Sequence, residues 1–73
     1  MNKYICPVCD INLGLWNFVV TANSFQDAED KIMAEIINNV NSDLDDRLHW
    51  IDFIKQADQK DIIIGEIQDI EEL

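Results

Sequence analysis

The chain has 73 residues, enough for one domain, and its 48% hydrophobic content with two glycines and one proline is too apolar for a disordered acidic segment. Its net charge of −10 disfavours direct contact with nucleic-acid phosphates and with anionic lipid. The sequence lacks both the run of about 18 apolar residues that a membrane span needs and the apolar region of a signal peptide, so we expect an intracellular, cytoplasmic protein.

The first predicted element is a β-hairpin. Residues 3–11 are mostly apolar, and residues 15–22, after the turn at 12–14, are rich in Val, Phe and Trp. Alternate residues of a strand share a face. In the second strand the set that we expect in the core is Trp16, Phe18, Val20 and Ala22. Pro7 in the first strand indicates either a sheet edge or a β-bulge.

A helix is predicted at residues 25–39. Ser24 is a typical N-cap residue, and Asp27 lies in the first turn, where the helix dipole favours negative charge. Apolar residues at intervals of three, four and seven predict a buried stripe made of Phe25, Ala28, Ile32, Met33, Ile36, Ile37 and Val40. Glu29 falls within the arc of this stripe, so we expect its side chain to lean outward.

Residues 43–57 have two interpretations. With Ser42 or Asp43 as the N-cap, they form a second helix whose apolar residues are Leu44, Leu48, Ile51 and Ile54. Alternatively, the alternation in residues 49–54 predicts a strand and a C-terminal hairpin that turns at residues 58–61.

The last predicted strand is 62–67, because three consecutive isoleucines favour extended structure. The predicted fold class is therefore α+β. A small antiparallel sheet from residues 3–22 and 61–69, with the order ββαβ or ββααβ, packs on one or two helices as a single domain.

The motif Cys6-Pro7-Val8-Cys9 could bind a metal. A two-residue spacer allows both thiolates to bind one zinc ion, but a tetrahedral site needs two further ligands. The chain has no second cysteine pair and a single histidine. A complete site would therefore need His49 with a carboxylate, or a homodimer in which two chains share four cysteines. The alternatives without metal are two structural thiols, or a homodimer held by apolar contacts.

The same motif has two family resemblances. Residues 4–9 resemble one knuckle of a zinc ribbon, although this sequence has no second knuckle. Residues 6–9 also resemble the redox motif of glutaredoxins, which implies a thiol-disulfide oxidoreductase with Cys6 as the activated thiol. The sequence departs from the glutaredoxins because a β-rich run with Gly14 stands where the helix should be, and because no later proline supplies their cis-proline.

The acidic residues are concentrated after residue 26. Residues 1–26 carry one acid and one base, whereas residues 27–73 carry fourteen acids and four bases. Their spacing does not match a calcium-binding loop. They either solvate the surface or imitate the phosphate rows of nucleic acid and bind a basic partner. The predicted partner-binding residues, with Trp50 as an aromatic anchor, are Asp43, Asp45, Asp46, Trp50, Asp52, Glu66, Asp69, Glu71 and Glu72.

Residues 18–28 (FVVTANSFQDA) contain an apolar strand, a capping residue and an acid-alanine pair that opens a helix. This segment resembles small phage-encoded inhibitors with a ββαβ layout, such as the phage inhibitor of host RNA polymerase, and the chain is similar in size and acidity to anti-CRISPR proteins. The resemblance implies a non-enzymatic inhibitor of a basic, nucleic-acid-handling protein of a bacterial host. The polymerase inhibitor has basic residues on its last strand, whereas residues 62–69 have none.

Overall fold

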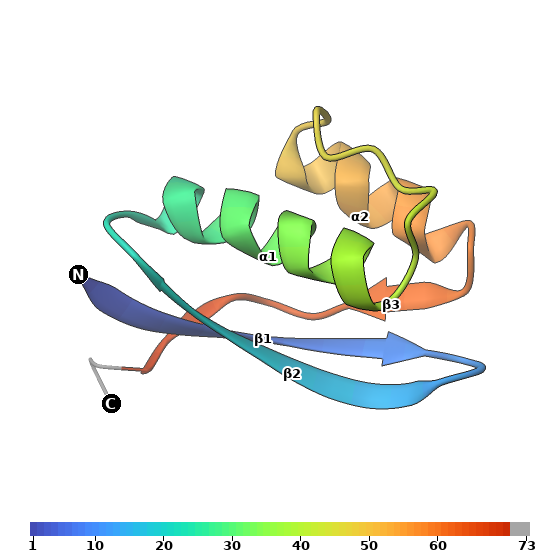
Figure 1. The fold of residues 1–73 in the computed structure, drawn as a ribbon, viewed down its shortest axis with the longest axis horizontal. Helices are drawn as coiled ribbons and strands as arrows, with labels where there is room; N and C mark the ends of the chain where they lie inside the picture. The colour runs from blue at the N-terminus through green and yellow to red at the C-terminus, as the bar shows by residue number, and fades with distance from the viewer. Residues whose placement is uncertain (71–73) are drawn as a thin grey trace.

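An antiparallel four-stranded sheet carries two helices on one of its faces (Figure 1). This computed structural model describes residues 1–70. The elements follow in the order β1 (Asn2–Asp10), β2 (Gly14–Ala22), α1 (Phe25–Asn39), α2 (Trp50–Asp58), β3 (Ile62–Ile64) and β4 (Gln68–Asp69). The predicted α+β class is confirmed. The strand predicted at 62–67 is only three residues long, Ile62–Ile64, and a second short strand follows it at Gln68–Asp69.

Strands β1 and β2 form the predicted hairpin and pair along their whole length, beginning with Asn2 opposite Ala22. At the turn, the Asp10 carboxylate accepts the backbone N–H of Asn12 at 2.7 Å. Gly14 closes the turn with a φ of 101°, a conformation that favours glycine. Strand β1 is central, because β2 lies on one side of it and β3 and β4 on the other. Strand β2 therefore forms one edge of the sheet.

Pro7 lies opposite a β-bulge in the neighbouring segment 65–67. The bulge predicted in its own strand is absent, because β1 pairs with β2 residue by residue. Strand β1 pairs with β3 at residues 8–10 and with β4 at residues 4 and 5, so Cys6 and Pro7 face the three residues 65–67. Proline has no N–H to donate to a neighbouring strand. Its carbonyl still accepts the backbone N–H of Gly65 at 2.8 Å. The sequence prediction of an edge position for this strand is wrong, since β1 is paired on both sides.

Helix α1 has the predicted bounds. The Ser24 side chain accepts the N–H of Asp27 at 3.1 Å, and the buried residues of the helix are Ala28, Ile32, Met33 and Ile36. Phe25 was predicted in the core but is 49% exposed, and its ring makes a T-shaped contact with the Tyr4 ring, with centroids 5.4 Å apart. Glu29 is half-buried, and the resulting desolvation raises the pKa of its carboxyl group.

Helix α2 begins at Trp50, whereas the sequence predicted a start near residue 43. The preceding segment forms a loop in which side chains bind nearby backbone: Asn41 accepts the N–H of Asp43, and Asp45 accepts the N–H of Arg47. Such bonds compete with helical hydrogen bonds. The alternative prediction of a strand over residues 49–54 is wrong.

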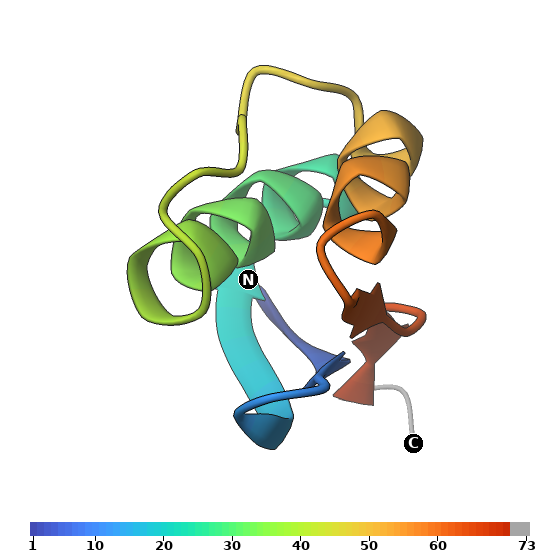
Figure 2. The same ribbon diagram turned by 90° about the vertical axis from the view of Figure 1, so that its right-hand side faces the viewer.

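The core lies between the sheet and the two helices, which cover the same face (Figure 2). Its largest fully buried side chains are Phe53, Ile32, Ile36, Ile62, Val8 and Cys6. Of the set predicted on β2, Val20 and Ala22 are buried, whereas Trp16 and Phe18 are half-buried.

Within residues 1–70 no helix has both the length and the apolar character needed to cross a membrane.

Candidate functional site

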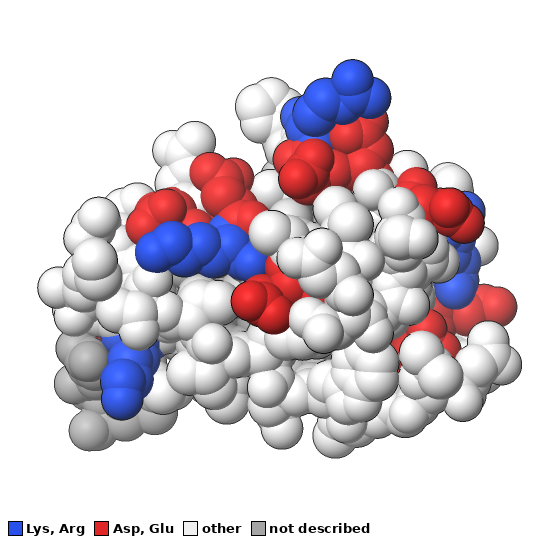
Figure 3. All heavy atoms as spheres, in the orientation of Figure 1, with Lys and Arg blue, Asp and Glu red and all other residues white. Residues whose placement is uncertain are grey.

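Charged side chains gather on the helical side of the molecule. Residues 23–61 contain ten acids and four bases, a net charge of −6. The acids are Asp27, Glu29, Asp30, Glu35, Asp43, Asp45, Asp46, Asp52, Asp58 and Asp61. In Figure 3 the acidic side chains lie over the upper part and the right-hand end of the molecule, blue also appears at the lower left, and the lower margin at the centre of the view is white. We call the surface formed by α1, α2 and the 40–49 loop the helical side.

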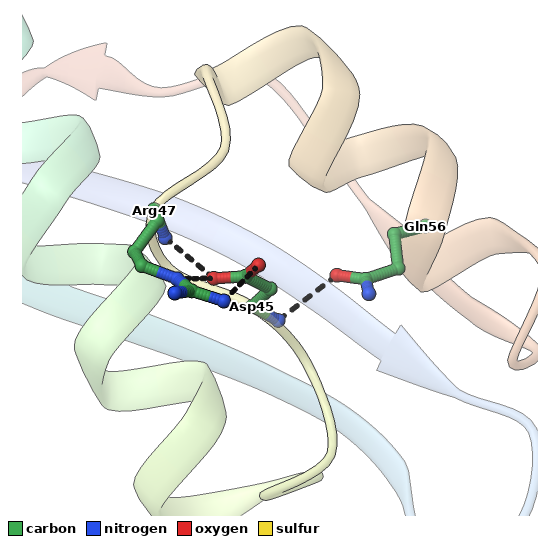
Figure 4. A network of polar contacts seen from close by, with 3 residues as sticks. All are labelled: Asp45, Arg47 and Gln56. Atoms are coloured by element: carbon green, nitrogen blue, oxygen red, sulfur yellow. Dashed lines mark hydrogen bonds and ion pairs between the residues drawn. The ribbon is translucent and has the colours of Figure 1, made fainter.

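The loop between the helices is held in place by a small polar network (Figure 4). The backbone N–H of Asp45 donates to Oε1 of Gln56 on α2 at 3.0 Å. The Asp45 carboxylate in turn accepts two bonds from the Arg47 guanidinium, at 3.0 and 3.1 Å, and these bonds lower the pKa of the Asp45 carboxyl group. Arg47 thus offsets the charge of Asp45, while the neighbouring Asp43 and Asp46 are exposed.

Two predicted binding residues lie at the start of α2. Asp52 is exposed in the first turn. Trp50 is half-buried and stacks on Phe53, with ring centroids 6.3 Å apart and ring planes at 14°. Part of the Trp50 ring is therefore used in packing α2 on the core.

Glu66 and Asp69 lie outside this surface. In Figures 1 and 2 the 40–49 loop lies above the helices, whereas the segment that contains Glu66 and Asp69 runs at the level of the sheet. Asp69 pairs with Tyr4 in the ladder and accepts a hydrogen bond from the Asn2 side chain at 2.9 Å. Glu71 and Glu72 lie outside the described residues. Asp69, which is opposite buried Tyr4, shares the helix-covered face of the sheet, but it lies on β4 and not on the helices or the 40–49 loop.

The two cysteines point to opposite faces of β1, because they are three residues apart in a strand. Cys6 is fully buried against the helices, and burial raises the pKa of its thiol to about 11. Cys9 is half-buried on the other face, where it pairs with Leu15 and Ile63. Within residues 1–70, no group of three His, Cys, Asp or Glu side chains is placed to hold a metal ion. The shared zinc site stays a prediction, which metal analysis of the purified protein tests.

The sequence interpretation assigned no role to the second face of the sheet. We call it the open face, because neither helix covers it. Its paired strand positions are Lys3, Ile5, Pro7, Cys9, Leu15, Asn17, Val19, Thr21, Ile63 and Gln68. None of them is acidic, and Leu15, Val19 and Ile63 are 66%, 55% and 55% exposed. The signal was present in the sequence, since both alternating sets of β2 contain large apolar residues.

A shallow groove of about 700 Å³ lies at the outer edge of β2, beside the C-terminal half of α1. Its lining residues are Leu15, Trp16, Asn17, Phe18, Glu35 and Asn39. The Glu35 carboxylate accepts a hydrogen bond from the Asn39 side chain at 3.0 Å. None of the predicted binding residues lines this groove.

Comparisons of the chain with protein-family models, with curated proteins and with solved structures found no match. The molecule presents two chemically different surfaces, the acidic helical side and the open face of the sheet.

Proposed function

We propose that this protein is a non-enzymatic acidic binding protein whose helical side docks a basic, nucleic-acid-handling protein and blocks that partner's nucleic-acid site. The supporting observation is the separation of charge between two surfaces. Residues 23–61 have a net charge of −6, whereas the paired strand positions of the open face include no acid. A surface of this kind attracts cationic partners over a distance of several ångströms.

The exposed acids of the loop and of α2 would make the first contact. Asp43 precedes the Asp45–Arg47 pair, Asp46 lies between its two members in the sequence, and Asp52 lies at the start of α2. The bond from Asp45 to Gln56 limits the motion of the loop, which lowers the entropy lost when a partner binds. Electrostatic attraction would raise the association rate and make it fall with increasing salt.

The biological role that we propose for this binding is inhibition of a bacterial host protein, in the manner of phage-encoded or mobile-element inhibitors. The proposal extends the resemblance carried by residues 18–28. A DNA-mimic inhibitor would compete with nucleic acid for the same positively charged channel.

The test begins with capture of a partner from a bacterial lysate on the immobilised protein, followed by identification of that partner. The captured protein is then titrated with fluorescent DNA in the presence of this chain. We expect competition between the two, and an affinity at least tenfold weaker for the triple variant Asp43→Asn, Asp46→Asn, Asp52→Asn.

The matched control is Glu66→Gln, which removes a charge away from the helical side. We expect this control to bind the partner within about twofold of the unchanged chain. Retention of full affinity by the triple variant, or simultaneous binding of DNA and this chain to the partner, would refute the proposed function.

A further inference from the structure

We propose that the open face of the sheet is a homodimer interface, on which a second copy of this chain packs face to face about a twofold axis. This interface goes beyond the proposed function and uses the opposite side of the molecule. Both helices lie on one side of β1 and β2, so neither helix covers the other side of the sheet (Figures 1 and 2).

The open face has the composition of an interface core. Strand β2 contributes Leu15 and Val19, and β3 contributes Ile63, each more than half exposed in the single chain. Half-buried Ile5, Pro7 and Cys9 of the central strand join them across the sheet. A contiguous apolar surface of this kind on a small protein is typical of an interaction site.

The size of the face suits a weak dimer. Strands of nine residues are about 30 Å long, and three strands side by side are about 14 Å wide, so each copy presents roughly 400 Å² in projection. Because side chains protrude from the sheet, its accessible surface exceeds its projected area. Two copies would together bury on the order of 1,000 Å² of accessible surface. This value lies at the lower end for specific interfaces.

Charge identifies a second copy as the occupant. The chain has a net charge of −10, so two copies repel one another when their helical sides approach. The paired positions of the open face carry one charge, that of Lys3, and no acid. Packing face to face keeps the two helical sides on the outside of the dimer. The open face, whose paired positions carry no acid, can therefore be self-complementary, as a twofold interface requires.

The experiment is sedimentation velocity over a concentration series, with Leu15→Glu and Leu15→Lys as test variants. Each variant places a charge in the contact, and we expect at least a tenfold increase in the dissociation constant for both signs of charge. The two variants change the net charge in opposite directions. Weaker dimerisation in both therefore reports loss of the contact and not a change in net charge. The control is Ile51→Glu on the outer surface of α2, because Ile51 and Leu15 are both 66% exposed. We expect the control to dimerise as the unchanged chain does.

The thiol of Cys9 gives a second readout that is specific to this face. Cys6 is fully buried, so Cys9 is the thiol available for alkylation. We expect its alkylation rate to fall as dimers form with rising protein concentration. A chain that stays monomeric up to about 1 mM would overturn the proposal. Dimerisation that leaves Cys9 equally reactive, or that Ile51→Glu weakens as much as Leu15→Glu, would also overturn it.

Discussion

Gly65 and Pro7 are in direct contact across the β-bulge. The backbone N–H of Gly65 donates to the carbonyl oxygen of Pro7 at 2.8 Å, and a Cβ atom at residue 65 would lie 2.6 Å from Cγ of Pro7. The thiol of Cys6 also donates to the carbonyl oxygen of Gly65, at 3.4 Å. Glycine is therefore needed at residue 65 because the backbone there lies so close to the Pro7 ring.

We expect Gly65→Ala to lower the free energy of unfolding by about 1–3 kcal/mol, because the added methyl group must displace the rigid ring of Pro7. Urea denaturation measures this loss. Pro7→Ala removes the clashing atom, so the double variant should recover about 1 kcal/mol relative to the sum of the single effects.

Gly14→Ala is the control for this comparison of single and double variants. Its cost comes from a left-handed φ of 101°, and no atom lies within 4 Å of an added Cβ. We expect the effects of Gly14→Ala and Pro7→Ala to be additive. Additive effects for Gly65→Ala and Pro7→Ala would show that contact with the Pro7 ring is not what requires glycine at residue 65.

The buried thiol of Cys6 predicts a loss of stability in alkali. Burial raises the pKa of Cys6 from 9.0 to about 11, so between these values the unfolded chain releases a proton that the folded chain retains. The contribution to stability is complete below pH 9 and falls by up to about 2 kcal/mol as the pH rises to 11. Urea denaturation at about pH 8 and about pH 10.5 measures this fall, which Cys6→Ala should reduce and Cys9→Ala should retain.

The cap of α1 predicts a smaller effect. Ser24→Ala removes the acceptor for the N–H of Asp27, and we expect it to lower the free energy of unfolding by about 1 kcal/mol. Ser42→Ala, at an exposed position in the loop after α1, is the control and should change stability by less than about 0.5 kcal/mol. Equal losses for the two variants would argue against a capping role for Ser24.

Elements with strong local signals were predicted well from the sequence. The hairpin follows from two apolar runs and a short turn that ends in glycine, and α1 follows from its Ser24 cap and its regular apolar stripe. Local signals were insufficient for α2. The stripe predicted for that helix included Ile51, which is exposed, and omitted Phe53, which is fully buried. Contacts with residues distant in the sequence determine which side of a short helix is buried.

The candidate surfaces could be predicted only in part. The sequence identifies the acids but cannot place the 40–49 loop on one side of the molecule and Glu66 on another, because this depends on chain topology. The opposite directions of Cys6 and Cys9 could have been inferred, since residues three apart in a predicted strand face opposite sides. The open face also follows from alternation once both helices are known to cover the other face of the sheet.

The net charge of −10 predicts that salt stabilises the fold. We expect the melting temperature to rise by several degrees between about 10 mM and about 300 mM NaCl, because salt screens the repulsion between acids on the helical side. The variant Asp30→Asn, Asp43→Asn, Asp46→Asn has a net charge of −7, that is, −10 plus three removed charges, and should respond less. An unchanged melting temperature for the natural chain would contradict the prediction.

The contact between Asp45 and Gln56 predicts a change confined to the loop. Gln56→Ala removes the acceptor for the Asp45 N–H, which otherwise lies 3.0 Å from Oε1. We expect the amide hydrogen of Asp45 to exchange at least tenfold faster with solvent, because its protection depends on this bond. Arg47→Ala is the matched control, since it removes the ion pair to the Asp45 carboxylate but keeps the amide bond to Gln56. Faster exchange at Asp45 in both variants would mean that the ion pair also holds the loop. Unchanged exchange in Gln56→Ala would remove the argument that the loop is ordered before a partner binds.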